Sequence, residues 1–279
     1  MQCRLPRIHT IERLPAIGTA LNDMSWEDIR KISDAGLASS YFNVGDRKEV
    51  TLNGTVGNLS LSNVTTYAFI IGFDHNASVE GSNRIHFQLA KTALTGGTDV
   101  CLCDSSYNSN VSTTGYFSMN SSLTNSGGWA SSQMRTNICG TSLSSYSGTI
   151  IAVIPAALRA VLKSVTKYTD NTGGGSTAAS AVTATTDYFF LLSEYEVFGS
   201  ISGAKSNSNE ASKQAQYAYY SAGNSKIKYK HNGTSTAAFW WLRSPNSSNS
   251  YHFVFVFVDG TVYGTNANDS LGFAPGFCV

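Results

Sequence analysis

The stretch YHFVFVFVDG, residues 251–260, begins with an uncharged ladder of aromatic residues and valines in a chain otherwise rich in Ser, Thr, Asn and Gly. Because successive side chains of a strand point to opposite faces, the ladder has two faces: Tyr251, Phe253, Phe255 and Phe257 on one, and His252, Val254, Val256 and Val258 on the other. Either both faces are buried or one displays its aromatic rings. An exposed strand without charges promotes aggregation, so a chain that displays one needs a use for it.

The composition around this ladder is low in charge. Charged residues make up 13% of the 279 residues, about half of the usual globular value. The formal net charge of +1 provides no overall field to attract nucleic acid or an anionic membrane. Solubility then depends on neutral polar side chains, which is typical of β-rich, loop-rich proteins of virions and extracellular surfaces.

The N-terminal segment and the cysteines indicate where the chain is made. Arg, His and Glu interrupt every apolar run in residues 1–24, so we predict no signal peptide, and no run approaches the ~20 apolar residues of a membrane span. The five cysteines are an odd number, and Cys101 and Cys103 are too close for an ordinary bridge. We expect synthesis in a reducing cytoplasm, with the protein reaching the outside in a virion released by lysis; a bacterial cell surface is the alternative location.

The pattern along the chain predicts one β-rich domain with a few short helices and long inserted loops. Residues 1–23 are predicted to be an attachment arm and residues 24–279 a single domain. In residues 24–36, Ser25 can cap a helix that Gly36 ends. The other predicted elements are hairpins over 41–89, irregular loops over 104–149 pinned by Tyr116, Phe117 and Trp129, a helix over 155–168, a flexible excursion over 169–187, a strand and helical turn over 188–200, a short helix over 210–224, and then strands and turns.

Motifs for metal binding or catalysis are weak. The pair Cys101 and Cys103, even with Cys139, lacks the usual zinc spacing, and the tract from Asp104 lacks the Gly and Glu of a calcium loop, so an ordinary turn is the better interpretation. No standard hydrolase, zinc-protease or phosphate-loop motif is present. We therefore predict a protein that is not an enzyme and that needs no cofactor or metal.

The scattered ionisable residues favour structural roles. His75 and His86 are expected to satisfy hydrogen bonds in the core or in loops. Glu194 and Glu196, two residues apart, point in different directions on a strand or a helix and make a poor acid and base pair. The tract KIKYKH, residues 226–231, is interpreted as a solvated edge strand protected by lysines, because one basic tract does not make a nucleic-acid footprint.

The C-terminal segment has the most distinctive pattern. The ladder lies between WWLRSP, residues 240–245, and GFAPGFCV, residues 272–279. No Lys, Glu, Gln, Met or Trp occurs between Asn246 and Phe273. Residues 240–279 therefore combine a stiff Trp and Pro frame with a restricted set of residue types between its two parts.

These residues resemble a known family. The motifs WWLRSP, DG and APGFCV, together with SWEDIRKISDAGLASSYFNVGDRKEVTLNGTVG, FIIGFDHN, SNRIHFQLAK, LRAVLKSVTKYTDN, TATTDYFFLLSEYEVFG and KQAQYAYYSAGNSKIKYKH, make residues 24–279 similar to the DUF6273 family of phage and gut-bacterial proteins. The resemblance implies a C-type lectin-like α+β fold. It also implies a variable protein of a diversity-generating retroelement, in which error-prone reverse transcription at adenines changes AAY codons to residues other than Lys, Glu, Gln, Met and Trp.

The resemblance divides the variable region that it implies, residues 240–279, into two sets of positions. The implied scaffold consists of Trp240, Trp241, Arg243, Pro245, Phe253, Val256, Asp259, Gly260, Gly272 and Pro275. The implied diversified, ligand-facing positions are Tyr251, His252, Phe255, Phe257, Tyr263, Thr265, Asn266, Asn268, Asp269 and Leu271. Phe253 and Val256 differ in parity, so we predict a bulge or turn between them that redirects Phe255 and Phe257.

The function that follows is ligand or receptor binding by a phage tail or virion adhesin. Aromatic rings set among Asn, Ser and Thr would bind a host cell-surface protein or glycan. The arm would attach the chain to other virion proteins or to sister chains, as a homo-oligomer, and no nucleic acid or membrane insertion is expected. The alternative is a structural virion protein, a head or tail decoration with no external ligand. In that case the same aromatic residues would lie buried in subunit contacts.

Overall fold

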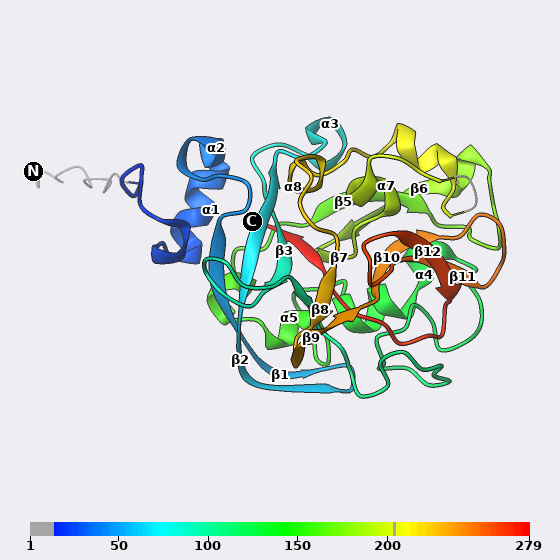
Figure 1. Ribbon diagram of the computed structural model, residues 1–279. Coiled ribbons are helices and arrows are strands. Elements are labelled where there is room, and N and C mark those ends of the chain that lie inside the picture. Colours follow the sequence, from blue (N-terminus) through cyan, green and yellow to red (C-terminus); the bar gives the residue numbers. More distant parts are fainter. Residues whose placement is uncertain (1–13, 203–204) are drawn as a thin grey trace, which may run out of the picture.

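The computed structural model of the protein describes residues 14–202 and 205–279 and has a mixed α+β architecture, in which several small sheets are joined by long loops and short helices (Figure 1). The α+β class expected from the sequence is confirmed at this level. The helices are α1 (Trp26–Asp34), α2 (Ala38–Tyr41), α3 (Ala77–Glu80), α4 (Gly128–Ser131), α5 (Ile150–Val153), α6 (Ala156–Arg159), α7 (Glu194–Phe198) and α8 (Ala218–Ser221). Short 3₁₀ turns lie at Leu21–Asp23, Ala179–Ala181 and Ser208–Ser212, and a π-helical turn lies at Met134–Cys139. None of the described helices has the length and apolar character that crossing a bilayer requires.

The largest sheet has five strands in the order β1-β2-β3-β13-β7. The first three are the long hairpins predicted over 41–89, namely β1 (Arg47–Val56), β2 (Leu59–Phe73) and β3 (Ile85–Lys91). Between β3 and β7 (Phe189–Phe190) lies β13 (Gly276–Cys278), antiparallel to both. The C-terminal strand is therefore an interior strand of this sheet, with neighbours from distant parts of the chain.

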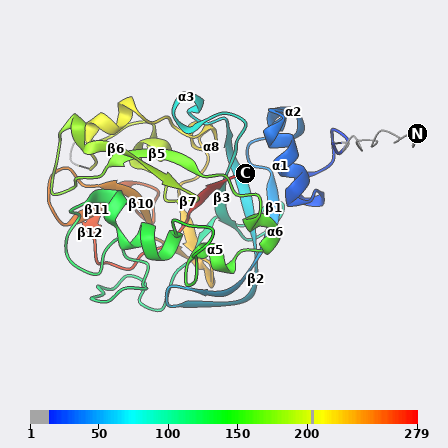
Figure 2. The same ribbon diagram turned by 180° about the vertical axis from the view of Figure 1, so that it is seen from behind.

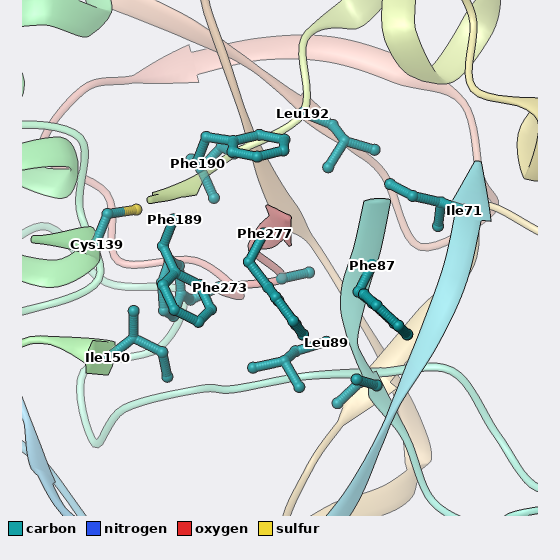
Figure 3. Close-up of a cluster of buried hydrophobic side chains, with 14 of the residues drawn as sticks. Ile71, Phe87, Leu89, Cys139, Ile150, Phe189, Phe190, Leu192, Phe273 and Phe277 are labelled. Carbon is teal, nitrogen blue, oxygen red and sulfur yellow. The ribbon is translucent and has the colours of Figure 1, made fainter. Parts of the chain in front are cut away.

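The main core packs around β13. Phe277 contacts Phe87 and Phe189 with ring centroids 5.2 Å apart in each case. Figure 3 shows Phe277 between these two rings, with Phe190 and Leu192 nearby. All are buried, so burial of this cluster links the N-terminal hairpins, the middle of the chain and its C-terminal strand.

Three smaller sheets cover the rest of the molecule. Their strands are β4 (Val100–Cys101), β8 (Lys228–Lys230) and β9 (Gly233–Ala238) in the order β4-β8-β9; β5 (Val165–Asp170) with β6 (Val182–Asp187); and β10 (Trp240–Pro245), β11 (His252–Val256) and β12 (Val262–Asn266) in the order β10-β11-β12. Figures 1 and 2, which view the molecule from opposite sides, both place α1 at one end and β11 and β12 at the other.

The first predicted helix is confirmed. The Ser25 hydroxyl accepts a hydrogen bond from the Asp28 backbone N–H at 3.0 Å, and α1 buries Trp26, Ile29 and Ile32. Gly36 follows with a φ of 69°, a left-handed conformation that glycine adopts without strain. Of the predicted arm, residues 1–13 lie outside the described residues. Leu21 is already buried, so the folded body includes the end of the 1–23 segment.

The helix predicted over 155–168 is mostly wrong. Only α6 forms, ending at Arg159, and β5 begins at Val165. The flexible excursion predicted over 169–187 is wrong at its two ends, because residues 169 and 170 belong to β5 and β6 pairs with β5 in a regular antiparallel register, whereas residues 171–181 do form a connection without strands. The Asp170 carboxylate accepts hydrogen bonds from the backbone N–H groups of Thr172 and Gly173, which closes the turn after β5. Pairing with the β-branched strand that follows along the chain outweighed the local apolar spacing that predicted a helix.

Two other segments refine the predictions. Residues 104–149 are mainly irregular, as expected, with Phe117 and Trp129 fully buried and Tyr116 half-buried, but they also contain α4 and the π-helical turn.

The tract KIKYKH is not an exposed edge, because β8 lies between β4 and β9. Lys228 is buried, with its Nζ 5.3 Å from the ring centroid of Phe69 and 5.1 Å from that of Trp240. The two ring faces stabilise the Lys228 ammonium group inside the protein, whereas the sequence pattern had predicted a solvent-exposed lysine.

Candidate functional site

Both faces of β11 are buried, which answers the question raised by the aromatic ladder. Phe253, Val254 and Val256 are 0% exposed and Phe255 is 7% exposed. The predicted bulge between Phe253 and Val256 is wrong, since β11 keeps a regular register with β12. The irregularity lies in β10, between Trp241 and Pro245, which pair with Phe255 and Phe253. Both faces of β11 are packed against other parts of the protein. Phe253 and Val256 can therefore point to opposite faces of a regular strand and both be buried, without a bulge between them.

At the edge of this sheet the aromatic packing reaches the surface. Tyr107, Phe239, Phe257 and Tyr263, here called the aromatic row, follow one another with centroid separations of 6.4, 4.9 and 5.3 Å. The first three are half-buried and Tyr263 is 47% exposed. Phe255 lies beneath the row, 5.6 Å from Phe239 and 6.4 Å from Tyr263 by ring centroids. The row is therefore a surface feature on a buried aromatic floor.

A lysine lies at each end of the aromatic row. The Nζ of Lys205 is 4.5 Å from the Tyr263 centroid, and the Nζ of Lys230 is 4.2 Å from the Tyr107 centroid. Such cation–π contacts attract the ammonium groups to the ring faces and hold them at the edges of the apolar surface. The combination offers a partner flat apolar contacts in the middle and a positive charge at each end.

The structure separates the ten predicted ligand-facing positions into two groups. Tyr251, 41% exposed, and Tyr263 are open to solvent, and six positions are partly exposed: His252, Phe257, Thr265, Asn266, Asn268 and Asp269. For Phe255 and Leu271 the predicted ligand-facing position is wrong, because both side chains are buried. Phe255 is the floor of the aromatic row, and Leu271, 2% exposed, lies in the core, with its backbone N–H bonded to the Phe117 carbonyl at 3.0 Å. Neither side chain is available to a ligand in this conformation.

A polar rim next to β12 is held by its own hydrogen bonds. Thr265 donates its hydroxyl to the Asp269 carboxylate at 2.6 Å, and Asn110 donates its side-chain amide to the same carboxylate. Asn268 donates to the Val111 carbonyl at 3.2 Å. The loop that carries Asn110 and Val111 is thus tied to the segment after β12, so that the partly exposed positions sit on a preorganised frame.

Eight of the ten predicted scaffold residues are buried: Trp240, Trp241, Arg243, Pro245, Phe253, Val256, Gly272 and Pro275. Asp259 and Gly260 instead form the turn between β11 and β12. Asp259 is exposed and accepts from the Thr261 backbone N–H at 2.9 Å, and Gly260 has a φ of 86°. These two residues shape the hairpin without contributing to the core.

Sequence reasoning missed half of the aromatic row. Tyr107 comes from a loop about 130 residues before Phe239, and the two meet because the Tyr107 hydroxyl accepts the Phe239 backbone N–H at 2.8 Å. Phe239 had a usable signal, since it precedes Trp241 by two residues and so shares its face of the strand. Nothing local in the sequence around Tyr107 indicates its partner.

A second cluster, also missed, is a buried ionic network. Lys167 donates to Glu80 at 2.7 Å, to Glu196 at 2.9 Å and to the Tyr217 hydroxyl at 2.8 Å, while both terminal nitrogens of Arg243 bind Glu196. Every charged member is at most 4% exposed. Burial raises the pKa of Glu80 to about 7; burial alone would also raise that of Glu196, but Arg243 and Lys167 hold it below its ordinary value.

The same network contains the one group of metal-ligating atoms found among the described residues. One ligand atom each from His75, Glu80 and Glu196 lie within 4.8 Å of one another. Lys167 already binds both carboxylates, so an ammonium group supplies the positive charge that these carboxylates need. Burial lowers the pKa of His75 to about 3, which keeps its ring neutral in the stack with Tyr217. The geometry describes a structural network closed to a substrate.

The other weak motifs resolve into local structure. Cys101 and Cys103 lie with their sulfurs 3.9 Å apart, and among the described residues they do not join Cys139 in a metal-ligating group. Asp104 accepts from the Ser106 and Phe117 backbone N–H groups at 2.9 and 2.6 Å, which makes its tract an ordinary turn. Glu194 binds Ser202 and Ser206, whereas Glu196 faces the ionic network, so the two carboxylates do diverge.

Comparisons with known proteins identify one family. The model of a domain of unknown function, DUF6273, matches residues 104–279. No curated protein and no solved structure shows significant similarity to the chain. The match contains all of β10–β12, both lysines at the ends of the aromatic row and Tyr107, so the candidate surface lies entirely within the matched region.

Proposed function

The chain belongs to the DUF6273 family, and from that premise we propose that it is a ligand-binding protein whose C-terminal segment forms the recognition surface. The observation that carries this proposal is the aromatic row with its terminal lysines. Tyrosine and phenylalanine offer large contact areas at a low cost in conformational entropy, and such aromatic side chains are typical of binding hot spots. The rigid floor of Phe255 and Trp241, whose ring centroids are 6.3 Å apart, supports these rings.

The finer form of the proposal is a diversified phage adhesin with a C-type lectin-like fold. The eight exposed or partly exposed positions defined above would be the diversified ones, set on the Trp and Pro frame. The absence of Lys, Glu, Gln, Met and Trp between Asn246 and Phe273 supports this proposal. Its test is genomic: a near-copy of the DNA encoding residues 240–279, differing at adenines and placed beside a reverse-transcriptase gene. Without such a copy, the diversification part fails and binding remains.

The proposed setting is a virion in which several copies of the chain act together. Single copies of an unoptimised surface bind weakly, and multiple copies raise the overall affinity through effective concentration. A homo-oligomer attached through its N-terminal arm would satisfy this requirement. The ligand would be a protein or glycan on the host surface.

A structural virion role is the second candidate, and the incomplete burial of Phe257, Phe239 and Tyr263 within one chain favours it. A neighbouring subunit could complete the cover of these rings. The two candidates differ in what touches the aromatic row: an external ligand in the first and another virion subunit in the second.

The binding test uses the purified full chain against a glycan microarray and a panel of intact gut-bacterial cells. The double variant Phe257→Ala, Tyr263→Ala is expected to reduce binding about tenfold or more, the range typical of hot-spot truncation. Leu94→Ser is the control, because Leu94 is an exposed apolar residue, 41% exposed, in the loop after β3, outside both the aromatic row and the predicted arm.

Equal binding by the double variant and the wild-type chain would contradict the proposal. Analytical ultracentrifugation of the wild type and the double variant tests the structural role. If the wild type binds no probe and the double variant changes its oligomeric state, the aromatic row belongs to subunit contacts.

A further inference from the structure

A polar cavity lies at the end of the molecule opposite the aromatic row. It has a volume of about 500 Å³ and lies between α1, the turn before β3 and the segment before β5. Its lining residues are Arg30, Asp34, Ser82, Asn83, Arg84, Leu162, Lys163, Ser164 and Tyr188. Figures 1 and 2 both show α1 far from β11 and β12. The cavity is therefore separate from the proposed ligand surface.

The charges around this cavity do not balance. Three cations, Arg30, Arg84 and Lys163, line it with a single carboxylate, Asp34. Asp34 is shared by Arg30 at 2.8 Å and Lys163 at 2.7 Å. Burial alone would raise the pKa of Asp34, but its hydrogen bonds to Lys163 and Arg30 hold it below the ordinary value, so Asp34 stays charged. Counted over the lining side chains alone, two positive charges are in excess; the carboxyl end of Val279, which accepts from the Ser33 hydroxyl at 2.7 Å beside Lys163, offsets part of this excess.

Arg84 is the cation without a partner. None of the described carboxylates forms an ion pair with it, and its Nε and Nη1 are shielded and lack a hydrogen-bond acceptor among the described residues. The nearby Asp74 carboxylate binds the backbone N–H of Arg84 at 2.9 Å. A guanidinium left without acceptors loses hydration without compensation. Side-chain rotamers commonly change on binding, so a ligand in the cavity need only turn this guanidinium toward itself.

The cavity wall is already fixed. Ser33 donates its hydroxyl to the Asn83 carbonyl at 2.8 Å, Asn83 donates its side-chain amide to the Asp34 carbonyl at 3.0 Å, and Lys163 donates to the Ser33 hydroxyl at 3.0 Å. These bonds join three separate parts of the chain around the cations. A ligand would meet a largely preformed site.

We propose that this cavity binds the phosphate group of a small phosphate monoester. Arginine forks match phosphate oxygens, and the excess of positive charge suits a phosphate anion. The hydroxyls of Ser82, Ser164 and Tyr188 line the same cavity as further donors. A cavity of about 500 Å³ is much larger than a phosphate ion and leaves room for the esterified group. This site does not depend on the proposed adhesin function.

The test measures thermal unfolding of the full chain with inorganic phosphate, glycerol 3-phosphate or sodium chloride at matched ionic strength. Glycerol 3-phosphate at saturating concentration should raise the melting midpoint by about 2 °C or more, and inorganic phosphate should raise it by less. Arg84→Gln should abolish both shifts. Arg84→Lys should weaken binding about tenfold, because it keeps the charge but loses the fork.

The matched control is Arg47→Gln, since Arg47 is also half-buried and lines a different cavity, together with Asp46. This variant should keep the full shift. The proposal is overturned if the wild-type chain responds equally to chloride and to phosphate, or if Arg84→Gln keeps the shift. If Arg84→Gln does not fold, the comparison of Arg84→Lys with the wild-type chain by calorimetric titration decides, and equal affinities would count against the site.

Discussion

At the scale of single residues, this chain places much of its small charge complement inside the protein. Lys167, Glu196 and Arg243 are each at most 1% exposed, and each forms several hydrogen bonds. Arg243 also donates to the Thr169 hydroxyl at 2.6 Å and to the Leu191 carbonyl at 2.8 Å. Removing one member of such a network leaves an uncompensated buried charge, at a cost of about 3–5 kcal/mol. The network joins β5, α7 and β10, so its role is to fix elements relative to one another.

Glu210 gives a prediction for pH. Its carboxylate is fully buried and accepts from the Asp170 backbone N–H at 2.9 Å and from the Ser244 hydroxyl at 2.7 Å. Burial raises its pKa from 4.5 to about 7, against the lowering effect of these hydrogen bonds. The folded state therefore binds the proton more tightly than the unfolded state does. The stability contributed by the protonated form is complete below about pH 4.5 and is lost as the pH rises through about 7.

The corresponding experiment compares the wild-type chain with Glu210→Gln by urea unfolding at pH 5 and pH 8. Relative to the Gln variant, the free energy of unfolding of the wild-type chain should fall by about 2.5 kcal/mol between pH 5 and pH 8, as linkage requires for a pKa raised from 4.5 to about 7. Glu49→Gln, an exposed change, controls for removing one negative charge. A constant difference between the wild type and Glu210→Gln at both pH values would show that the buried carboxyl does not titrate in this range.

At the scale of elements, the close approach of the Gly272 backbone to its neighbours next to β10 leads to a second prediction. The isolated bridge between Trp240 and Gly272 brings Gly272 against Cys101 Sγ, and a Cβ added there would lie 2.7 Å from the Phe239 carbonyl oxygen. No real Cβ tolerates such contacts, so Gly272→Ala must shift the backbone. We expect a loss of about 1–3 kcal/mol in the free energy of unfolding.

Gly233→Ala is the matched control for this change. Gly233 lies in β9, lacks a positive φ and would place its Cβ in open space. Urea unfolding should show a change within about 0.5 kcal/mol for this variant, or a slight gain. Similar losses in both variants would mean that the approach of Gly272 to Cys101 is not what constrains the position.

The elements that could be predicted from the sequence are those with strong local signals. The Ser25 cap and the apolar face of α1, the turn-separated hairpins β1–β3, and the helical turn within 188–200 that became α7 are of this kind. The failures depend on partners outside the segment being predicted. Val165–Asp170 became a strand because Val182–Asp187 pairs with it, and Lys228 became buried because β4 and β9 flank β8. For the candidate site, the alternation of the ladder indicated Phe257 and the family resemblance implied Tyr263, whereas Tyr107 required the fold.

At the scale of the whole molecule, the sheet order sets the limits of the domain. The family model begins at residue 104, yet β13 pairs with β3, which lies before that point. The other neighbour, β7, is only two residues long. Phe277 and Phe87 stack across the β3–β13 pair at 5.2 Å. The C-terminal strand of the matched region therefore obtains one of its two neighbouring strands, and the ring that stacks on Phe277, from residues 47–91.

This dependence predicts how pieces of the chain behave. A fragment of residues 104–279 should lack a cooperative urea transition and the near-ultraviolet circular dichroism of packed aromatic rings, because losing β3 exposes one edge of β13 and the face of Phe277. A fragment of residues 14–279 is the control and should unfold like the full chain, since Leu21 and every element that packs around β13 lie within it. A cooperative transition with a native-like aromatic spectrum in the 104–279 fragment would make that region an autonomous domain. The single domain predicted over residues 24–279 would then be wrong, because β1–β3 would be an accessory to a core that folds without them.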